Sequence, residues 1–187
     1  MASNFGKTIQ VSTFGASHGY AIGGIVEGLP CGHTIDIDEL QAFLKRRAPG
    51  QNQLQTQRKE ADIPEFLSGM VDGMLSGSPL AFMIRNTSQH SGDYNNLRDI
   101  PRPSHADFTA RIRYGDKVDM RGGGHFSARL TAPLCVAGGI ALQLLREKGI
   151  EIHGHLKQVG TIQDAPIDMV HPDMKALGNI AAEPIAM

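Results

Sequence analysis

The sequence predicts a single α+β domain, and three observations support this fold class. Apolar residues make up 41% of the 187 residues, which is enough to bury a core. The 22 glycines punctuate short apolar runs, as expected for strands joined by tight turns. Two longer segments, residues 37–47 and 127–148, show helical apolar spacing instead. We therefore expect strands and helices to share one domain over residues 1–187.

Short apolar runs mark the expected strands. Residues 5–14 and 22–29 are separated by a glycine-containing turn, and each has the length of a strand. Residues 66–71 and 80–84 flank a Ser-Gly-Ser-Pro turn, which predicts a hairpin. Residues 150–163 are expected to form a further strand, after which the chain carries no clear element.

The first helix is expected at residues 37–47. Asp36 can cap its N-terminus, and Leu40 and Leu44 lie on one face of the helix. The sequence Ala-Pro-Gly at residues 48–50 ends it. Its last residues are basic, which the helix dipole favours for structural reasons alone.

Two more helices are expected at residues 105–114 and 127–148. Pro133 lies near the start of the second, so that helix must begin late or kink there. A polar loop at residues 86–103 carries no core pattern, and loops of that length often have a function.

The charge distribution favours a small anionic ligand. The formal net charge is -1 and the pI is near 6.7, which argues against nucleic-acid and membrane-surface binding. Residues 45–129 nevertheless carry thirteen of the eighteen Lys and Arg against nine acids, an excess of four positive charges. Tryptophan is absent and aromatics are 5%, so a base-stacking surface is not expected.

The cysteines and the apolar segments indicate a soluble cytoplasmic protein. Cys31 and Cys135 are far apart in sequence, which excludes a CxxC pattern and predicts reduced thiols. Residues 1–10 contain no signal-peptide core, and residues 132–145 are too short to span a bilayer. His153 and His155 have no third ligand at zinc-like spacing, so no metal site is expected.

His18 and His105 are the candidate catalytic residues. His18 follows a predicted strand in Gly-Ala-Ser-His-Gly, where an imidazole can serve as general acid or base. The alternative is a surface histidine in a turn. His105 follows Arg-Pro-Ser, which suits an anion site, while Ser104 and Asp107 could form a capping box at a helix N-terminus.

A triglycine loop at residues 121–129 precedes the last predicted helix. Its amides could cradle a phosphate, although its spacing matches neither the P-loop nor the dinucleotide-binding fingerprint. A simple flexible loop is the alternative.

Taken in order, these motifs resemble chorismate synthases over residues 3–163. The resemblance rests on NFG at 4–6, TFGASHG at 13–19, RRAPG at 46–50, QRKE at 57–60, LSG at 67–69, DY at 93–94, RPSHAD at 102–107 and DMRGGGHFSAR at 119–129. It implies helices sandwiched between antiparallel sheets, a homotetramer when full length, and a lyase of aromatic amino-acid biosynthesis that eliminates phosphate from 5-enolpyruvylshikimate-3-phosphate with reduced FMN.

The resemblance also assigns roles to residues of this sequence. His18 would protonate the departing phosphate, and His105 would protonate or stabilise the reduced flavin. The substrate would be held by Arg47, Arg102, Arg129 and Ser17. The flavin would lie against His125, Phe126 and Ser127, and Arg47 would also contact NADPH in a bifunctional protein.

The sequence departs from the family pattern at several of these positions. The family usually has Glu at the positions of Ala16 and Leu130, Gly at Ser104, Arg-Ser at His125 and Phe126, and a second arginine at Gln53. Family members are also roughly double this length, so the chain is expected to be the N-terminal part of one. Two alternatives remain open: a non-catalytic anion-binding or assembly module derived from this fold, and an unrelated phosphohydrolase with His18 as its nucleophile.

Overall fold

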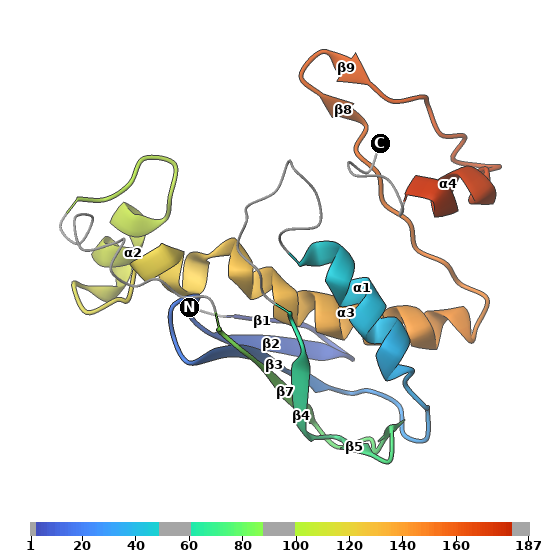
Figure 1. Cartoon of the computed structure of the whole chain (residues 1–187), viewed down its shortest axis with the longest axis horizontal. Helices are drawn as coiled ribbons and strands as arrows, with labels where there is room; N and C mark the ends of the chain where they lie inside the picture. The colour runs from blue at the N-terminus through green and yellow to red at the C-terminus, as the bar shows by residue number, and fades with distance from the viewer. Residues whose placement is uncertain (1–2, 49–60, 88–99, 181–187) are drawn as a thin grey trace. The chain divides into compact units, whose positions relative to one another are not determined.

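The structure, a computed structural model, describes residues 3–48, 61–87 and 100–180. The chain divides into two compact units, Met1–Leu144 and Leu145–Met187 (Figure 1). The single domain expected over residues 1–187 stays a prediction. Residues 49–60 and 88–99 lie outside the described part of the chain, and with them the QRKE and DY motifs, Gln53 and most of the predicted polar loop.

The first unit is built on one antiparallel sheet of five strands. The order across the sheet is β1-β2-β3-β7-β4. The strands are β1 (Asn4–Gly6), β2 (Gln10–Gly15), β3 (Ala21–Glu27), β4 (Pro64–Ser68) and β7 (Leu80–Arg85). Helices cover one face of this sheet (Figure 1), which confirms the α+β class with antiparallel pairing.

The single strand predicted at residues 5–14 is wrong, because the segment folds into the hairpin β1–β2. Gly6 pairs with Gln10 across the turn. The φ of Gly6 is +97°, and a Cβ there would lie 1.9 Å from the Ile9 carbonyl oxygen. Only glycine fits such a reversal, and a loosely alternating pattern does not reveal it.

The predicted hairpin between residues 66–71 and 80–84 is confirmed in part. β4 and β7 pair, with Phe66 opposite Phe82. The chain between them forms a second ribbon, β5 (Met70–Val71) and β6 (Met74–Leu75), rather than a simple turn.

Helices α1 (Ile37–Arg47) and α3 (Thr131–Arg146) pack on the sheet. The α1 prediction is confirmed, including the cap, since the Asp36 carboxylate accepts from the Glu39 amide at 2.9 Å. α3 begins at Thr131 rather than at residue 127, which places Pro133 in the first turn, where no amide bond is lost. Two short 3-10 helices precede it, η2 (Arg121–Phe126) and η3 (Ala128–Leu130).

α1 and α3 contact each other closely above the core. A Cβ on Gly139 of α3 would lie 2.5 Å from Cδ1 of Leu40. Gln143 donates to the Asp36 carbonyl and accepts from its amide, both at 2.9 Å, and so ties α3 to the start of α1. The core that these helices cover comprises Val11, Ile22, Val26, Leu40, Leu44, Leu80, Phe82, Ile84, Val136 and Ile140, among others.

The short helix α2 (Asp107–Tyr114) forms where expected, but the predicted capping box is wrong. Ala106 stands at the N-cap without a side-chain hydrogen bond. Ser104 adopts a positive φ of 63°, and the Asp107 carboxylate bonds Arg102 instead of a helix amide. The Asp107 carboxylate therefore forms an ion pair with Arg102 in place of the expected helix cap.

The second unit departs most from the sequence prediction. Residues 150–163 do not form one strand: only the two-residue strands β8 (Gln158–Val159) and β9 (Ile162–Gln163) pair, around Gly160 at a φ of 59°. Helix α4 (Met174–Ile180) forms where no element was expected.

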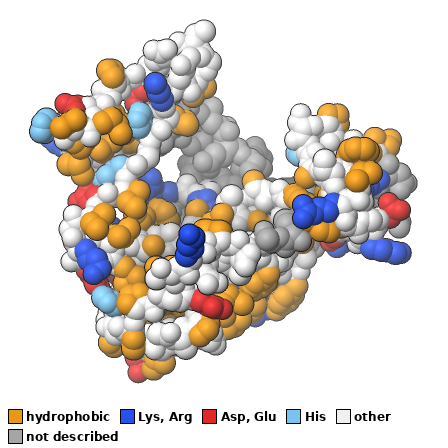
Figure 2. Space-filling model, turned by 180° about the vertical axis from the view of Figure 1, so that it is seen from behind, with side chains coloured by type: hydrophobic (Ala, Val, Ile, Leu, Met, Phe, Trp, Pro, Cys, Tyr) orange, Lys and Arg blue, Asp and Glu red, His pale blue; other side chains and the backbone are white. Residues whose placement is uncertain are grey.

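One helical segment, Arg121–Arg146, is long and apolar enough to cross a membrane by length and composition, which the sequence analysis did not expect. Core helices pass the same test. Here Val136 and Ile140, which belong to this segment, are fully buried in the core. The surface of the molecule also exposes large apolar side chains such as Leu67 and Ile112, and hydrophobic side chains cover much of the face in Figure 2.

Candidate active site

The turn between β2 and β3 carries Ser17 and His18. Gly15 leaves β2 with a φ of 95°, and the turn closes through a 3.0 Å hydrogen bond from the Gly19 amide to the Ala16 carbonyl. The His18 side chain is buried, with 5% exposure. The alternative of an exposed surface histidine is therefore wrong.

The hydroxyl of Ser17 fixes the tautomer of His18. Ser17 Oγ lies 3.2 Å from His18 Nδ1 and 3.0 Å from the Gly122 carbonyl oxygen. A carbonyl oxygen only accepts, so the hydroxyl donates to Gly122 and accepts from the Nδ1 hydrogen. This assignment from the hydrogen-bond partners leaves Nε2 as the atom of neutral His18 that can take up a proton.

The triglycine loop wraps around this turn. Gly122, Gly123 and Gly124 all have positive φ values, of 58°, 89° and 56°. A Cβ on Gly122 would lie 2.1 Å from the His18 ring, and the Ser17 amide donates to the Gly124 carbonyl at 3.1 Å. The loop therefore packs closely against His18. Its positive φ values favour glycine, and a side chain at Gly122 would clash with the His18 ring.

Asp119 and Arg121 brace the start of this loop. The Asp119 carboxylate accepts from Arg121 Nε at 2.9 Å and from Nη2 at 2.8 Å. These hydrogen bonds are the main cause that lowers the pKa of Asp119, and the nearby charge of His18 adds to the effect. Asp119 is thus held as a carboxylate close to the histidine.

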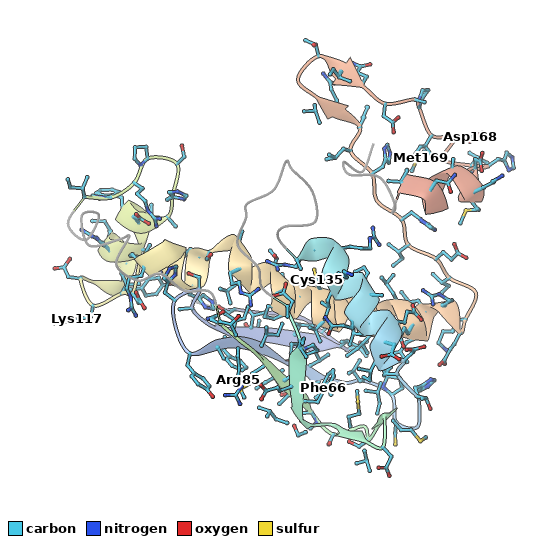
Figure 3. All side chains as sticks on the ribbon, viewed as in Figure 1. Phe66, Arg85, Lys117, Cys135, Asp168 and Met169 are labelled. Atoms are coloured by element: carbon cyan, nitrogen blue, oxygen red, sulfur yellow. The ribbon has the colours of Figure 1, made fainter. Side chains whose placement is uncertain are left out.

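Two of the predicted substrate arginines meet at one buried carboxylate. Asp62 is fully buried, and its two oxygens accept from Arg47 Nη1, at 2.5 Å, and from Arg129 Nη1. Arg47 Nε also donates to the Thr131 hydroxyl at 3.2 Å. Cys135 of α3, labelled in Figure 3, is close enough to Arg47 and Asp62 to interact with their charges, and burial raises the pKa of its thiol.

Asn86 joins these arginines to the histidine turn. Its Oδ1 accepts from Arg129 Nε at 3.2 Å. Its Nδ2 donates to the carbonyls of Ala16 and Gly19 at 3.0 and 2.8 Å. The cluster Arg47–Asp62–Arg129, called the arginine pair below, is therefore connected to the turn that holds His18.

Arg102 and His105 belong to a neighbouring group. Asp107 accepts a two-pronged ion pair from Arg102, at 2.8 and 2.9 Å. This partner is the main cause that lowers the pKa of Asp107. Arg102 Nη2 also reaches the Met120 carbonyl, at 3.4 Å, beside the triglycine loop. His105 is exposed on the loop before α2.

The predicted cofactor residues His125, Phe126 and Ser127 directly follow the three glycines of this loop. His125 Nδ1 donates to the Gly15 carbonyl at 2.7 Å, and its Nε2 lies 2.7 Å from the Ser3 hydroxyl. Ser127 Oγ accepts from the Arg129 amide. The Phe126 ring is partly exposed and lies 6.4 Å from that of Tyr114.

An open cleft of about 410 Å³ adjoins these residues. Its lining is largely uncharged and comprises Ser3, Asn4, Phe5, Thr13, His125, Ser127, Leu130, Thr131 and Leu134. Among the described residues, no group of three His, Cys, Asp or Glu side chains is arranged to hold a metal ion.

Sequence reasoning missed Asp62 and Asn86, which organise the site, and gave Asp107 a capping role instead of its ion pair with Arg102. Each is a short polar residue at the end of an element or in a loop, a place where turn residues are common. The only available signal was a polar residue directly after an apolar strand, as for Asn86 after β7.

Comparison with known proteins identifies the family. The family model described as chorismate synthase matches residues 9–183. The chain belongs to the chorismate synthase family. Chorismate synthase from Lancefieldella parvula is 47% identical over 177 residues, 94% of this chain and 46% of that protein. The Ralstonia pickettii chorismate synthase is 49% identical over 161 residues, 86% of this chain and 44% of that protein.

The fold agrees with this assignment. A crystal structure of chorismate synthase matches 97% of this chain and 48% of its own, with a TM-score of 0.67 and 24% identity. The chain spans just under half the length of the chorismate synthases that it matches. The resemblance expected from the ordered motifs is confirmed, as is the fold class.

The contact between Gly122 and His18 predicts a specific effect of a methyl group. Gly122→Ala should displace the imidazole, because the new Cβ would lie 2.1 Å from it. Gly123→Ala is the matched control, since its φ is also positive but its nearest side-chain atom is 3.5 Å away. Both should lose about 1–2 kcal/mol of stability from backbone strain. Only Gly122→Ala should shift the His18 ring signals in an NMR spectrum, and equal shifts in both variants would contradict this contact.

The Arg102–Asp107 pair predicts a pH-dependent contribution to stability. The folded pKa of Asp107 is lowered, so its stabilising effect is present above the unfolded pKa of about 4 and is lost as pH falls through the folded value. Asp107→Asn should cost about 1–3 kcal/mol at neutral pH, since a charged hydrogen bond is removed. Urea unfolding at several pH values should show the difference from wild type shrinking below about pH 4. A difference that is constant with pH would disprove it.

Proposed function

We propose that this chain carries the phosphate-elimination site of a chorismate synthase, which converts 5-enolpyruvylshikimate-3-phosphate into chorismate. The observation that carries the proposal is the arginine pair, two guanidinium groups held at one buried carboxylate and joined through Asn86 to the turn of His18. A cationic site beside a buried imidazole suits a phosphorylated, carboxylated substrate.

The arginine pair binds the anionic groups of the substrate. Each guanidinium has five N–H donors, more than the Asp62 carboxylate can accept, so binding of Asp62 and of substrate are compatible. Arg102 would add a third cation next to the triglycine loop. Ser17 holds the imidazole of His18 and thereby sets which nitrogen faces the reaction.

His18 serves as the acid. The 1,4-elimination breaks the bond between the ring carbon and the phosphate oxygen and removes one ring proton. In the protonated state His18 donates from Nε2 to the departing phosphate, and this proton makes the phosphate a better leaving group. Asp119 remains ionised nearby, because Arg121 holds its pKa below the usual value.

The family implies a flavin, and we assign reduced FMN. When bound, reduced FMN would supply transient electron density for the elimination without being consumed. The open cleft beside His125 and Ser127 suits a flat heteroaromatic group, and the exposed Phe126 ring can pack against one. His105, exposed before α2, is the residue assigned to protonate or stabilise the reduced flavin.

The remaining assignments concern the complete protein. We propose a homotetramer in the cytoplasm, and NADPH contact through Arg47 in a bifunctional form. Both cysteines are free in the structure, which is compatible with a reducing compartment.

A non-catalytic anion-binding module is the alternative function. One observation favours it: both ring nitrogens of His125 already bond protein atoms, so they are not available to a flavin. Tight phosphate binding with no FMN binding in a flavin titration would support the module and contradict the enzyme.

The proposal predicts how turnover depends on two histidines. The assay supplies substrate and reduced FMN without oxygen and follows chorismate absorbance, using the longest protein encoded by the reading frame that contains this chain. His18→Ala and His105→Ala should each lower kcat about a hundredfold or more, the usual effect of removing a general acid or base. Substrate binding should be largely kept.

His171→Ala is the control, because that side chain is exposed in the second unit. It should retain wild-type turnover. A wild-type protein that makes no chorismate would refute the enzymatic proposal, and turnover unaffected by His18→Ala would refute the assigned acid. Accumulation of a phosphohistidine would instead support the phosphohydrolase.

A further inference from the structure

Asn86 uses its entire side-chain amide to connect two parts of the site. Its Oδ1 accepts from Arg129 Nε at 3.2 Å, and its Nδ2 donates both hydrogens, to the carbonyls of Ala16 and Gly19. A side-chain amide has one acceptor and two donor hydrogens, so every group is engaged. Because Asn86 is only 9% exposed, water can hardly replace any of these hydrogen bonds.

The two carbonyls that Asn86 holds are the two ends of the histidine turn. Ala16 and Gly19 flank Ser17 and His18, and the amide of Asn86 spans them from outside. The backbone amide of Asn86 also donates to the Tyr20 carbonyl at 3.1 Å, which continues the β3–β7 pairing by one residue. The position of the turn is therefore set from the end of β7.

The other end of this connection is electrostatically fixed. Arg129 is bound by Asp62, whose side chain is fully buried and also holds Arg47. A buried carboxylate must keep its cationic partners, because an unpaired charge in the interior is strongly unfavourable. The location of Asp62 thus determines where Arg129 lies. The hydrogen bond from Arg129 to Asn86 links that position to the histidine turn.

We infer that Asn86 is a positioning residue that couples the arginine pair to His18, so that a change at Arg129 alters the geometry of the histidine turn. The chemical significance rests on the proposed function: if Arg129 binds the substrate phosphate, this coupling aligns His18 with the same phosphate. The coupling itself depends only on the hydrogen bonds within the chain.

Hydrogen exchange on the 187-residue chain tests the coupling without any ligand. Asn86→Ala removes all three bonds, while Arg129→Lys leaves Asn86 in place, keeps a cation for Asp62 and removes the Nε donor. The amides of Ser17 and Gly19 report on the turn, because the first donates to Gly124 of the triglycine loop and the second to Ala16 across the turn. Exchange of both should accelerate about tenfold in Asn86→Ala and by a smaller factor in Arg129→Lys.

Glu65→Gln is the matched control. Glu65 pairs with Arg85, the residue directly before Asn86, on the exposed part of the sheet, where Figure 3 labels Arg85. An exposed ion pair contributes little, so this variant should leave the turn amides unchanged. Turn exchange that stays at the wild-type rate in Arg129→Lys would overturn the coupling. So would acceleration of the core amides of β3 equal to that of the turn, since the effect would then be global.

Kinetics of the complete protein separate positioning from binding. Asn86→Ala should lower kcat about tenfold or more, with a smaller rise in KM. The arginines that bind the substrate remain in this variant, while His18 is misaligned. Glu65→Gln should leave both unchanged. An inactive wild-type protein would refute the proposed function, while the exchange results still decide the coupling. A rise in KM alone would contradict positioning of His18.

Discussion

The buried carboxylate of Asp62 is the interaction on which the rest of the site depends. Its side chain is fully buried and accepts from Arg47 at the end of α1 and from Arg129 in η3. Removing a carboxylate from water is unfavourable unless its partners are close and well aligned. The two arginines, which are 82 positions apart in the sequence, must therefore come together wherever the fold buries Asp62.

Three contacts hold the histidine turn around this centre. Asn86 ties its ends to Arg129, Ser17 orients the imidazole, and Gly122 fits against the ring. These contacts come from different parts of the chain. The Asn86 bonds limit translation of the turn, the Ser17 bond limits rotation of the ring, and Gly122 limits access to the ring. Such pre-organisation is what a general acid needs to act at one atom of a substrate.

Sequence reasoning succeeded where local chemistry is decisive. Helix α1 carries its own cap and apolar face, so its boundaries could be predicted from Asp36 to Arg47. The family could also be predicted, because the histidine, arginine and glycine motifs occur in the order that the family shows. Local patterns likewise predicted the glycine turn that carries His18.

Prediction failed where particular contacts in the fold override the local residue pattern or are not visible in it. Asp107 was expected to cap α2, but an arginine five residues earlier offers two charged hydrogen bonds, which outweigh one helix amide. Asp62 and Asn86 escaped notice because their partners, such as Arg129, are distant in sequence and only the fold brings them together. The hairpin at Gly6 depends on a backbone clash that the residue pattern does not express.

The assembly of the two arginines by Asp62 is tested most directly by a double-mutant cycle. Unfolding free energies would be measured in urea for wild type, Asp62→Asn, Arg129→Met and the double variant. Asp62 and Arg129 are predicted to couple by about 1 kcal/mol or more, because either single change leaves a charge without its main partner. If the two single-variant changes in unfolding free energy add to within about 0.5 kcal/mol, the two residues act independently. That result would contradict the assembly of the arginines by Asp62.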